Sequence, residues 1–521
     1  MKIKPRLTYT NSKDFIGEYI KCCGLDNIDG EVCYPPAKIN VNGLEEPICI
    51  IQDSDMDGVM SAAIVYNWLK ENGYIAKVLF HKGKQHGAMD LLDDIISTNG
   101  VGRYGTAIIP DAGSQDEYPI KEICKGMTDV IAIDHHEYHK WDMPCDARII
   151  NCKDWDMGNY LSGGAVCNYV LDANQMDLAA CSIISDVMPL NDVYNRYVVH
   201  IGLENITNPF LKYLVDKLNK GAKPTPKWVA WTLAPLVSSV ERSSNQDAKE
   251  LMFRAFVNEA DFDDALAIMR KCHREQKQKI DELYEQLTNN LDDSHKFVIA
   301  FADGDESNYN GLVANKILSK YNKPILVLRN LNNTQWSGSM RSPVPLLEQI
   351  NESGYATCQG HSMAAGIQVS KSQLHNLLEW ADNHDIDMHP AIDVACELNP
   401  SDIDLPLCQS IQEHMDLYGQ GIEEPLFYSK FIVNKDHIRV FRKSSNTLRI
   451  DNWDNVSLIK FRISDEDADF LENCDMIEME VTYRLSIDEY NGVQSCQGII
   501  DDIEWHDVNK PNEFDWDEIF N

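Results

Sequence analysis

The chain has 521 residues, of which 47 are Lys or Arg and 82 are Asp or Glu, giving a formal net charge of −35. Non-specific coating of nucleic acid is excluded, because it depends on neutralising phosphates with cations. No run of ~18 apolar residues is present, which excludes a membrane span, and the start Met1–Arg6 lacks the apolar core of a signal peptide. The 15 cysteines form no Cys-x-x-Cys pair, so we expect reduced core thiols and a cytoplasmic protein.

The first half of the chain predicts one large α/β domain with helical additions. Residues 1–45 indicate an N-terminal cap of helices and loops. From 46 to 200, apolar runs alternate with helical patterns, which predicts a doubly wound parallel sheet. Residues 201–295 predict a helical connector that ends in a long, charged, exposed helix from Asp263 to about Leu291.

The second half predicts two smaller domains. Residues 296–400 repeat the α/β pattern and indicate a second, smaller α/β unit. Between 421 and 509 the pattern changes to short alternating strands, which favours a small antiparallel barrel of the OB type. Those strands are expected at 427–433, 438–442, 456–463, 477–485 and 498–504. Residues 510–521 form an acidic, aromatic tail that we expect to be mobile.

Acidic residues and a histidine occur in four short stretches of the first α/β domain. In three of them the acid directly follows an apolar run that predicts a buried strand, and the ligand sites of open α/β sheets lie at that edge. The fourth acid ends the run Cys181–Ser185. The stretches are Asp53-Ser54-Asp55-Met56-Asp57-Gly58, Asp111-Ala112-Gly113-Ser114, Asp134-His135-His136 and Asp186.

This ligand set suits Mn²⁺ or Mg²⁺ better than zinc, because hard oxygen ligands dominate it. A pair of such ions about 3.5–4 Å apart activates water and stabilises an in-line displacement at phosphorus. The spacing lets Asp55 and Asp57 reach one ion, while Asp111 could bridge two and His135 and Asp186 could complete the set. We therefore predict a metal-dependent phosphoesterase with two ions.

Three other interpretations of these stretches were weighed. The first stretch resembles a calcium loop, but position 64, where the loop needs Glu, is Ile. Asp134 alone could be a helix N-cap. Adjacent histidines alone are more often surface residues than ligands. The four stretches together favour the metal site.

The same residues resemble the signature of the DHH phosphoesterase superfamily, and their order resembles its RecJ branch of single-strand-specific exonucleases. The resemblance continues through both smaller domains, over about residues 46–505. Its further motifs are Leu161-Ser162-Gly163-Gly164-Ala165-Val166, Ser185-Asp186-Val187-Met188-Pro189-Leu190, Gly338-Ser339-Met340-Arg341-Ser342, Gly360-His361-Ser362-Met363-Ala364-Ala365-Gly366 and Gly421-x-x-Glu424-Pro425-Leu426-Phe427. The family fold has a DHH domain, a long connecting helix, a DHH-associated domain and an OB-like barrel.

The resemblance implies roles for individual residues. Metal ligands would be Asp55, Asp57, Asp111, His135 and Asp186. Asp53 and His136 would be catalytic residues beside them, with His136 polarising the scissile phosphate or holding the geometry of the site. Ser339 and Arg341, assisted by Arg242, would bind the terminal 5′ phosphate, because a guanidinium matches phosphate oxygens. Gly360 and His361 would bring backbone to a second phosphate at a helix N-terminus.

The chain departs from the family pattern at three places. Ile51 stands where many members carry His, which would weaken one ion site. The segment Glu306-Ser307-Asn308-Tyr309 lacks the His usual in RecJ proteins. The residues before Arg242 lack the usual Asn-Ala-Gly. These departures concern contacts to DNA more than the metal chemistry.

The function implied by the resemblance is a metal-dependent 5′→3′ exonuclease on single-stranded DNA, in DNA repair, recombination or replication. A DHH phosphodiesterase acting on short oligonucleotides or cyclic dinucleotides is the alternative, and the C-terminal barrel argues against it. A non-catalytic scaffold in a replication or repair assembly is a third interpretation, and the intact acids argue against it. We expect a monomer whose partners, besides single-stranded DNA, are a single-strand-binding protein or a helicase.

Overall fold

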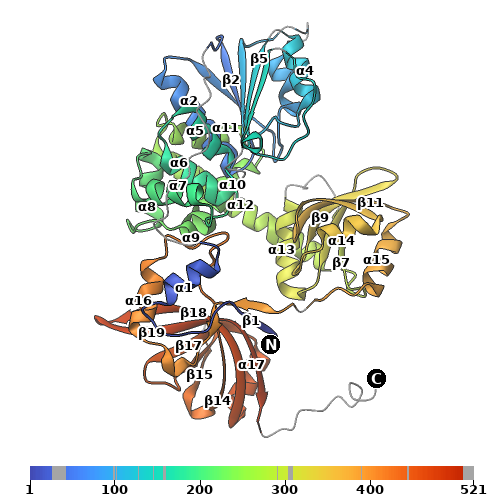
Figure 1. The fold of residues 1–521 in the computed structure, drawn as a ribbon. Helices are drawn as coiled ribbons and strands as arrows, with labels where there is room; N and C mark the ends of the chain where they lie inside the picture. Colours follow the sequence, from blue (N-terminus) through green and yellow to red (C-terminus); the bar gives the residue numbers. More distant parts are fainter. Residues whose placement is uncertain are drawn as a thin grey trace.

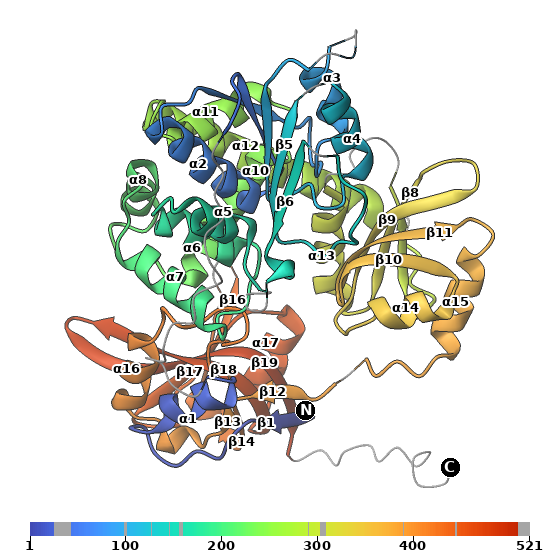
Figure 2. The same ribbon diagram turned by 45° about the horizontal axis from the view of Figure 1, so that its top comes forward.

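The computed structural model arranges the chain in three units (Figures 1 and 2). No helix in the described part of the chain is both long and apolar enough for a bilayer crossing. The predicted tail at 510–521, most of the departure at 306–309, and part of the N-terminal cap lie outside the described residues. The structure describes residues 1–25, 43–97, 100, 102–126, 128–144, 146–155, 160–289, 291–302, 309–388, 390–442 and 445–508.

The first unit contains a five-stranded sheet in the order β3-β2-β4-β5-β6, with all neighbours parallel. Alternate residues of each strand face opposite sides, so Ile48 and Ile50 enter one core and Cys49 and Ile51 the other. Figure 1 shows α2 and α4 on opposite sides of this sheet. The predicted doubly wound sheet is confirmed. Its strands are β2 (Ile48–Gln52), β3 (Ala76–Phe80), β4 (Thr106–Pro110), β5 (Asp129–Asp134) and β6 (Ala147–Asn151).

Helices cover both faces of this sheet. The 3₁₀ turn η1 and helices α3 and α4 pack on the face of Cys49, whereas α2, α5 and α6 pack on the other. Ser162 caps α5 by accepting a bond from Ala165 N. The bounds are α2 (Met56–Glu71), η1 (Met89–Leu91), α3 (Leu92–Ile95), α4 (Glu117–Lys125), η2 (Cys152–Asp154), α5 (Gly163–Leu171) and α6 (Met176–Ser185).

The expected helical connector is largely part of the first unit. Helices α7 to α11 bury their apolar faces in the same core as α2, α5 and α6. Helix α12 joins the first two units, because Leu266 and Met269 lie in the first core while Leu283 and Leu287 pack against β7 and α13. The bounds are α7 (Val193–Glu204), α8 (Pro209–Leu218), α9 (Pro226–Trp228), the π-helical turn η3 (Val229–Leu233), α10 (Ala234–Glu241), α11 (Gln246–Phe256) and α12 (Phe262–Thr288).

The second unit has a mixed sheet in the order β10-β11-β9-β8-β7, in which only β7 and β8 are parallel. It is the smaller α/β unit that the sequence predicts. Its elements are β7 (Val298–Phe301), α13 (Asn310–Tyr321), β8 (Ile325–Asn330), β9 (Gln335–Arg341), α14 (Leu347–Ser353), β10 (Ala356–His361), β11 (Ala364–Ser370) and α15 (Leu374–Asn383).

The third unit is a seven-stranded sheet in the order β13-β14-β18-β19-β17-β16-β15. It contains the five expected strands and adds β13 and β16, which are short. The bounds are β13 (Cys396–Glu397), η5 (Pro400–Asp402), α16 (Leu405–Glu413), β14 (Phe427–Asn434), η6 (Lys435–His437), β15 (Ile438–Arg442), β16 (Asn446–Ile450), β17 (Val456–Ile463), α17 (Asp465–Asn473), β18 (Met476–Tyr490) and β19 (Val493–Asp507).

The N-terminal segment belongs to the third unit and is not a separate cap. Strand β1 (Ile3–Pro5) pairs with β12 (Ile392–Val394), and α1 (Phe15–Cys22) buries its apolar face in the core of the third unit. The rings of Phe15 and Phe427 lie 5.3 Å apart. This placement differs from the predicted cap, because α1 is amphipathic and buries its apolar face against the C-terminal unit.

Candidate metal centre and phosphate site

The acidic stretches of the first unit meet at the carboxyl edge of the parallel sheet. Asp53 follows β2, Asp111 follows β4, and His135 follows β5, while Asp186 ends α6. The side chains form three groups, and within each group the candidate ligand atoms lie within 4.8 Å of one another. The groups are Asp53 with Asp55 and Asp111; Asp57 with His135 and Asp186; and Asp111 with His135 and His136.

His135 lies at the middle of this centre. Its Nε2 is 3.2 Å from Asp111 Oδ1, 3.5 Å from Asp186 Oδ2 and 3.8 Å from Asp57 Oδ2. The structure therefore brings together all five residues expected as ligands. It also places Asp53 within ligand distance, where the sequence assigned it only a neighbouring role.

Unsatisfied atoms at the centre fit bound cations. Asp111 Oδ1, His135 Nε2 and Asp186 Oδ2 are buried and make no hydrogen bond within the described residues, and Asp53 Oδ1, also buried, lies 3.2 Å from His86 Nδ1. Buried polar groups are normally paired, so these atoms, gathered at one point, fit a bound cation. Oxygen ligands with one imidazole suit Mn²⁺ or Mg²⁺, and the shared Asp111 allows two ions.

The charges of the centre lead to the same conclusion. Burial, with repulsion from the other acids, raises the pKa of Asp55 to about 6 and that of Asp186 to about 9. Burial and the neighbouring Asp57 also raise the pKa of Asp111. Burial lowers the pKa of His135 and so favours the neutral ring that binds metals. Cations at this point would relieve the repulsion among the carboxylates.

Backbone geometry holds the acids in place. Asp111 has φ 64°, in the left-handed region, where Asp is tolerated better than most residues. Asp55 caps α2 by accepting a bond from Gly58 N at 3.1 Å. Asp57 accepts bonds from Gly163 N at 2.8 Å and Gly164 N at 2.9 Å, at the start of α5. The glycine pair thus fixes one carboxylate through backbone donors.

Asp134 orients the histidines and is not itself in a ligand group. It ends β5, so the N-cap alternative does not apply. Its carboxylate accepts bonds from the N–H groups of Ser114, His135 and His136 and from His136 Nδ1 at 2.8 Å. Burial alone would raise the pKa of Asp134, but the bond from His136 holds it below its usual range.

We predict that Gly163→Ala removes metal binding without unfolding the protein. A Cβ at Gly163 would lie 2.6 Å from Asp111 Cβ, so the Asp111 carboxylate must move. Titration with Mn²⁺ should show at least a tenfold loss of affinity, about 1.4 kcal/mol. Gly17→Ala, in α1 with no atom within 4 Å of the added Cβ, is the matched control. Unchanged Mn²⁺ affinity in Gly163→Ala would contradict the assignment of Asp111.

Three cations from both α/β units face this acidic centre. Arg242 ends α10 in the first unit, and Arg341 ends β9 in the second. Burial and then the charge of Arg242 lower the pKa of Arg341. Lys84 joins them: burial and then Arg242 lower its pKa, while Asp55 opposes the shift. A phosphate between these side chains would offset their mutual repulsion.

Ser339 and Arg341 lie beside the start of α13. A Cβ on Gly311 would be 2.5 Å from Arg341 Nη2 and 3.7 Å from Ser339 Oγ. The two residues expected at a phosphate site are therefore neighbours, and only Gly leaves room for the guanidinium. Gly360 and His361 lie instead at the end of β10, in the hairpin with β11. These two residues do not begin a helix, but the N-terminus of α14 lies against their turn, where Leu346 N and Leu347 N donate to Ser362 O at 2.9 and 3.1 Å. A second phosphate at this place stays a prediction.

The loop between β3 and η1 was not predicted to belong to the site. It carries Lys84 near Arg242, and His86 Nδ1 lies 3.2 Å from Asp53 Oδ1. Its sequence, His81-Lys82-Gly83-Lys84-Gln85-His86-Gly87, matches no motif that we assigned. The available signal was its position, since it follows a strand of the parallel sheet as the acidic stretches do.

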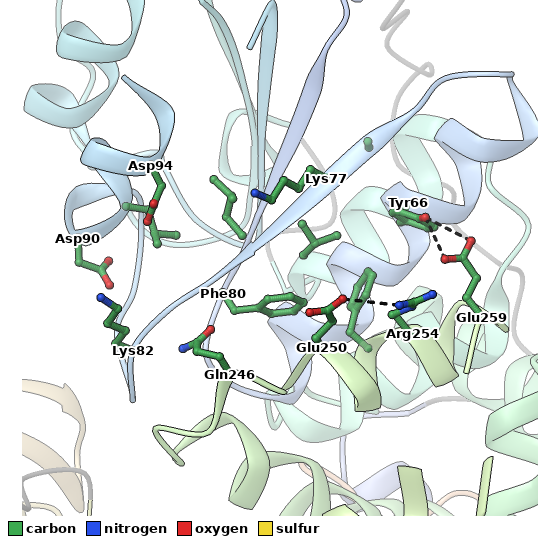
Figure 3. Close-up of a pocket in the computed structure, with 15 residues that line it drawn as sticks. Tyr66, Lys77, Phe80, Lys82, Asp90, Asp94, Gln246, Glu250, Arg254 and Glu259 are labelled. Atoms are coloured by element: carbon green, nitrogen blue, oxygen red, sulfur yellow. Dashed lines mark hydrogen bonds and ion pairs between the residues drawn. The ribbon is translucent and has the colours of Figure 1, made fainter. Parts of the chain in front are cut away.

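A separate pocket of about 490 Å³ lies on the outer side of β3 (Figure 3). Tyr66 and Arg254 line it, and each is paired with a glutamate, Glu259 and Glu250 respectively. None of its lining residues belongs to the metal centre or the cation cluster. The pocket is therefore distinct from the candidate site.

Comparison with known proteins agrees with this architecture. Residues 47–196 match the family model for the N-terminal domain of the DHH family, and residues 394–502 match the RecJ OB domain. The chain therefore carries a DHH-family N-terminal domain and a RecJ OB domain. This RecJ-like chain is 24% identical over 513 residues to a "Putative SPbeta prophage-derived single-strand DNA-specific exonuclease YorK" of Bacillus subtilis (strain 168), covering 87% of this chain and 86% of that protein.

Further relatives of the RecJ-like chain come from other bacteria. The "Single-stranded-DNA-specific exonuclease RecJ" of Haemophilus influenzae is 22% identical over 525 residues and is covered over 88% of each chain. The crystal structure of RecJ in complex with Mn²⁺ from Thermus thermophilus superposes with a TM-score of 0.69 at 20% identity, covering 89% of this chain and 69% of that one. At that identity, the structural match establishes the fold alone.

Proposed function

We propose that this RecJ-like chain is a metal-dependent exonuclease that hydrolyses phosphodiester bonds of single-stranded DNA from the 5′ end. The observation that carries the proposal is that a cluster of carboxylates lies next to a cluster of cationic side chains. Buried carboxylates with unsatisfied atoms lie beside Lys84, Arg242 and Arg341. Such a site attracts a phosphodiester to the cations and divalent metal to the acids. The single-strand-specific exonucleases among its relatives support the substrate class.

The roles of the chain's own residues follow from their positions. Asp55, Asp57, Asp111, His135 and Asp186 would hold two ions, with Asp53 within reach of one. Bound Mn²⁺ or Mg²⁺ would supply an activated water and stabilise charge at phosphorus. His136, held through Nδ1 by Asp134, would turn its other nitrogen toward the scissile phosphate. Arg341, Ser339 and Arg242 would bind the terminal 5′ phosphate and so align the next bond with the metal centre.

The third unit offers a surface for the strand itself. Phe441 on β15 pairs with Thr447 on β16, which pairs with Phe461 on β17, so the two rings lie in one row. They are 44% and 54% exposed. Exposed aromatics on a sheet suit stacking with bases, which needs no particular sequence. This row supports a polymeric substrate over the alternative of short oligonucleotides or cyclic dinucleotides.

We expect the double variant Phe441→Ala/Phe461→Ala to bind single-stranded DNA at least about 30-fold more weakly, since two stacking contacts of about 1–3 kcal/mol each are lost. Fluorescence anisotropy with a labelled oligonucleotide in EDTA measures this without cleavage. Ile432→Ala, on β14 and 49% exposed, is the control for loss of an exposed apolar side chain from the same sheet. Equal affinity of the double variant and the control would remove the row from the DNA path.

A digestion assay tests the proposed function. Single-stranded DNA, duplex DNA, RNA and dinucleotides, each labelled at one end, are incubated with Mn²⁺, with Mg²⁺ and with EDTA. The proposal requires mononucleotides from single-stranded DNA, release from the 5′ end first, and no cleavage in EDTA. Cleavage confined to dinucleotides would favour the phosphodiesterase alternative. Absence of cleavage on every substrate would favour the non-catalytic scaffold.

The cellular setting is part of the same proposal. An enzyme of this activity would act in repair, recombination or replication of DNA in the cytoplasm, as a monomer. Its strongly acidic surface, with a net charge of −35, would disfavour DNA away from the cation cluster. A single-strand-binding protein or a helicase that presents the 5′ end would therefore be a useful partner, and co-purification with the full chain tests this.

A further inference from the structure

Side chains of α11 hold the loop between β3 and η1 by donating hydrogen bonds to its backbone carbonyls. Lys249, on α11, is 0% exposed and donates from Nζ to His81 O at 2.9 Å and to Gly83 O at 3.4 Å. Gln246 Nε2 also donates to His81 O at 2.9 Å. A buried ammonium is costly unless it is paired, and Lys249 Nζ lies 3.5 Å from Oε2 of the buried Glu241. The same ammonium donates to the loop, so a buried ion pair anchors it. The position of the loop is set by α11.

The loop is also joined directly to the first acidic stretch. Gln85 N donates to Ser54 Oγ at 2.7 Å, and Ser54 Oγ donates to Gln85 O. Ser54 stands between Asp53 and Asp55 in the sequence. The loop therefore cannot shift without disturbing the metal centre, and the side chains that it presents are pre-organised relative to that centre.

Three imidazole rings form a row from the metal centre to the surface. The ring of His135 lies 4.4 Å from that of His136, which lies 4.7 Å from that of His86. Their side chains are 8%, 41% and 51% exposed, in that order. The row thus runs from the buried His135 to the exposed His86.

His86 repeats the arrangement of His136. Asp134, at the end of β5, faces His136 Nδ1 at 2.8 Å, and Asp53, just after β2, faces His86 Nδ1 at 3.2 Å. In both residues Nε2 is the nitrogen turned away from the carboxylate. Lys84, two residues before His86, lies near Arg242 and Arg341. The loop therefore extends from the metal centre to the cation cluster of Lys84, Arg242 and Arg341.

We propose that His86 is a further substrate-contacting residue, which binds a non-bridging oxygen of the scissile phosphate beside His136. The proposal rests on the proposed exonuclease function. The ligand class is the phosphodiester backbone of a single strand, since the described contacts of the ring row include no base-reading group. The competing interpretation is that His86 only braces Asp53. That interpretation predicts rescue by any side chain that keeps contact with Asp53.

The principal experiment compares His86→Ala with a matched control elsewhere in the chain. His200, on α7, has the same exposure, 51%, and a similar partner, with Nδ1 at 3.3 Å from Asp416 Oδ2. On a 5′-phosphorylated single strand at saturating Mn²⁺, we expect kcat of His86→Ala to fall about 100- to 1000-fold, as for loss of one charge-stabilising donor. His200→Ala should retain the wild-type kcat. Equal rates for the two variants would overturn the proposal.

A second measurement separates substrate contact from bracing. Sulfur is a poorer hydrogen-bond acceptor than oxygen, so a phosphorothioate at the scissile bond slows an enzyme that contacts the replaced oxygen. We expect His86→Ala to reduce that slowing by about threefold or more for one stereoisomer, the coupling of two groups in contact. His86→Gln, which can still reach Asp53, should share the loss in kcat. Full activity of His86→Gln, or an unchanged sulfur effect, would leave bracing as the role of His86.

Metal binding is followed in parallel by electron paramagnetic resonance of Mn²⁺. His86→Ala should bind as many ions as the wild type and with the same affinity. Loss of an ion would make His86 a metal ligand and would also overturn the proposal. The two proposals fail differently: a wild-type protein that cleaves no substrate refutes the exonuclease function, whereas active wild type with equally active His86→Ala refutes only the role of His86.

Discussion

Replacing Asp111 with Ala should abolish cleavage and leave binding of single-stranded DNA largely intact. Asp111 is 2% exposed, lies 3.2 Å from His135 Nε2, and belongs to two of the three ligand groups. Its removal disturbs both ion positions at once, whereas the cation cluster and the aromatic row remain. Cleavage is measured by release of end label with Mn²⁺, and binding by anisotropy in EDTA.

The control for this variant is Asp94→Ala. Asp94 belongs to the same unit but lines the separate pocket on the outer side of β3. It should retain the wild-type rate. If Asp111→Ala kept more than about a tenth of that rate, its loss would cost less than about 1.4 kcal/mol in the barrier. A central bridging role for Asp111 could not be reconciled with that result.

Replacing Arg341 with Ala should weaken action on 5′-phosphorylated strands and spare strands with a 5′ hydroxyl. A charge-assisted contact of a guanidinium with phosphate contributes about 1.5–3 kcal/mol, so kcat/KM should fall about 10- to 150-fold on phosphorylated ends. Arg341 is partly buried beside Arg242, which strengthens the expectation. A bound anion would offset both the lost hydration of Arg341 and its repulsion from Arg242. The measurement is the ratio of kcat/KM for matched 5′-phosphate and 5′-hydroxyl oligonucleotides.

Arg254→Ala serves as the control for Arg341→Ala. Arg254 lies on α11 in the outer pocket, 3.7 Å from Glu250, and should leave the ratio unchanged. Equal losses on both kinds of end in Arg341→Ala would show that Arg341 reads something other than the terminal phosphate. A loss limited to unphosphorylated ends would reverse its assigned role.

Local patterns predicted which acidic residues and histidine would meet, because each of them lies at a strand end or a helix end. Asp53, Asp111 and His135 directly follow buried apolar runs, and parallel strands bring such positions to one edge. Asp186 closes an apolar helix. The pattern could not show that Asp53 reaches a ligand group, because that depends on how the first stretch turns into α2.

Features set by distant parts of the chain escaped prediction. The pairing of β1 with β12 and of Phe15 with Phe427 has no local signature, so the N-terminal segment was predicted to be a cap. Strand β16 is short and half polar, with a shift of register after Asn446. The loop with Lys84 and His86 is held partly by Lys249, more than 160 residues later in the chain, and no local pattern shows that contact.

The placement of the N-terminal segment constrains the order in which the protein acquires its structure during synthesis. The amino group of Met1 pairs with Glu504 across 503 positions, at 2.6 Å, and α1 lies in a core built otherwise from residues after 390. A domain that folds as it leaves the ribosome usually proceeds from the N-terminus. Here the first two α/β units can fold before β1 and α1 have their partners. Helix α1 remains without its apolar partner until the residues after 390 have been translated, so it reaches its native contacts later than the two α/β units that follow it in the chain.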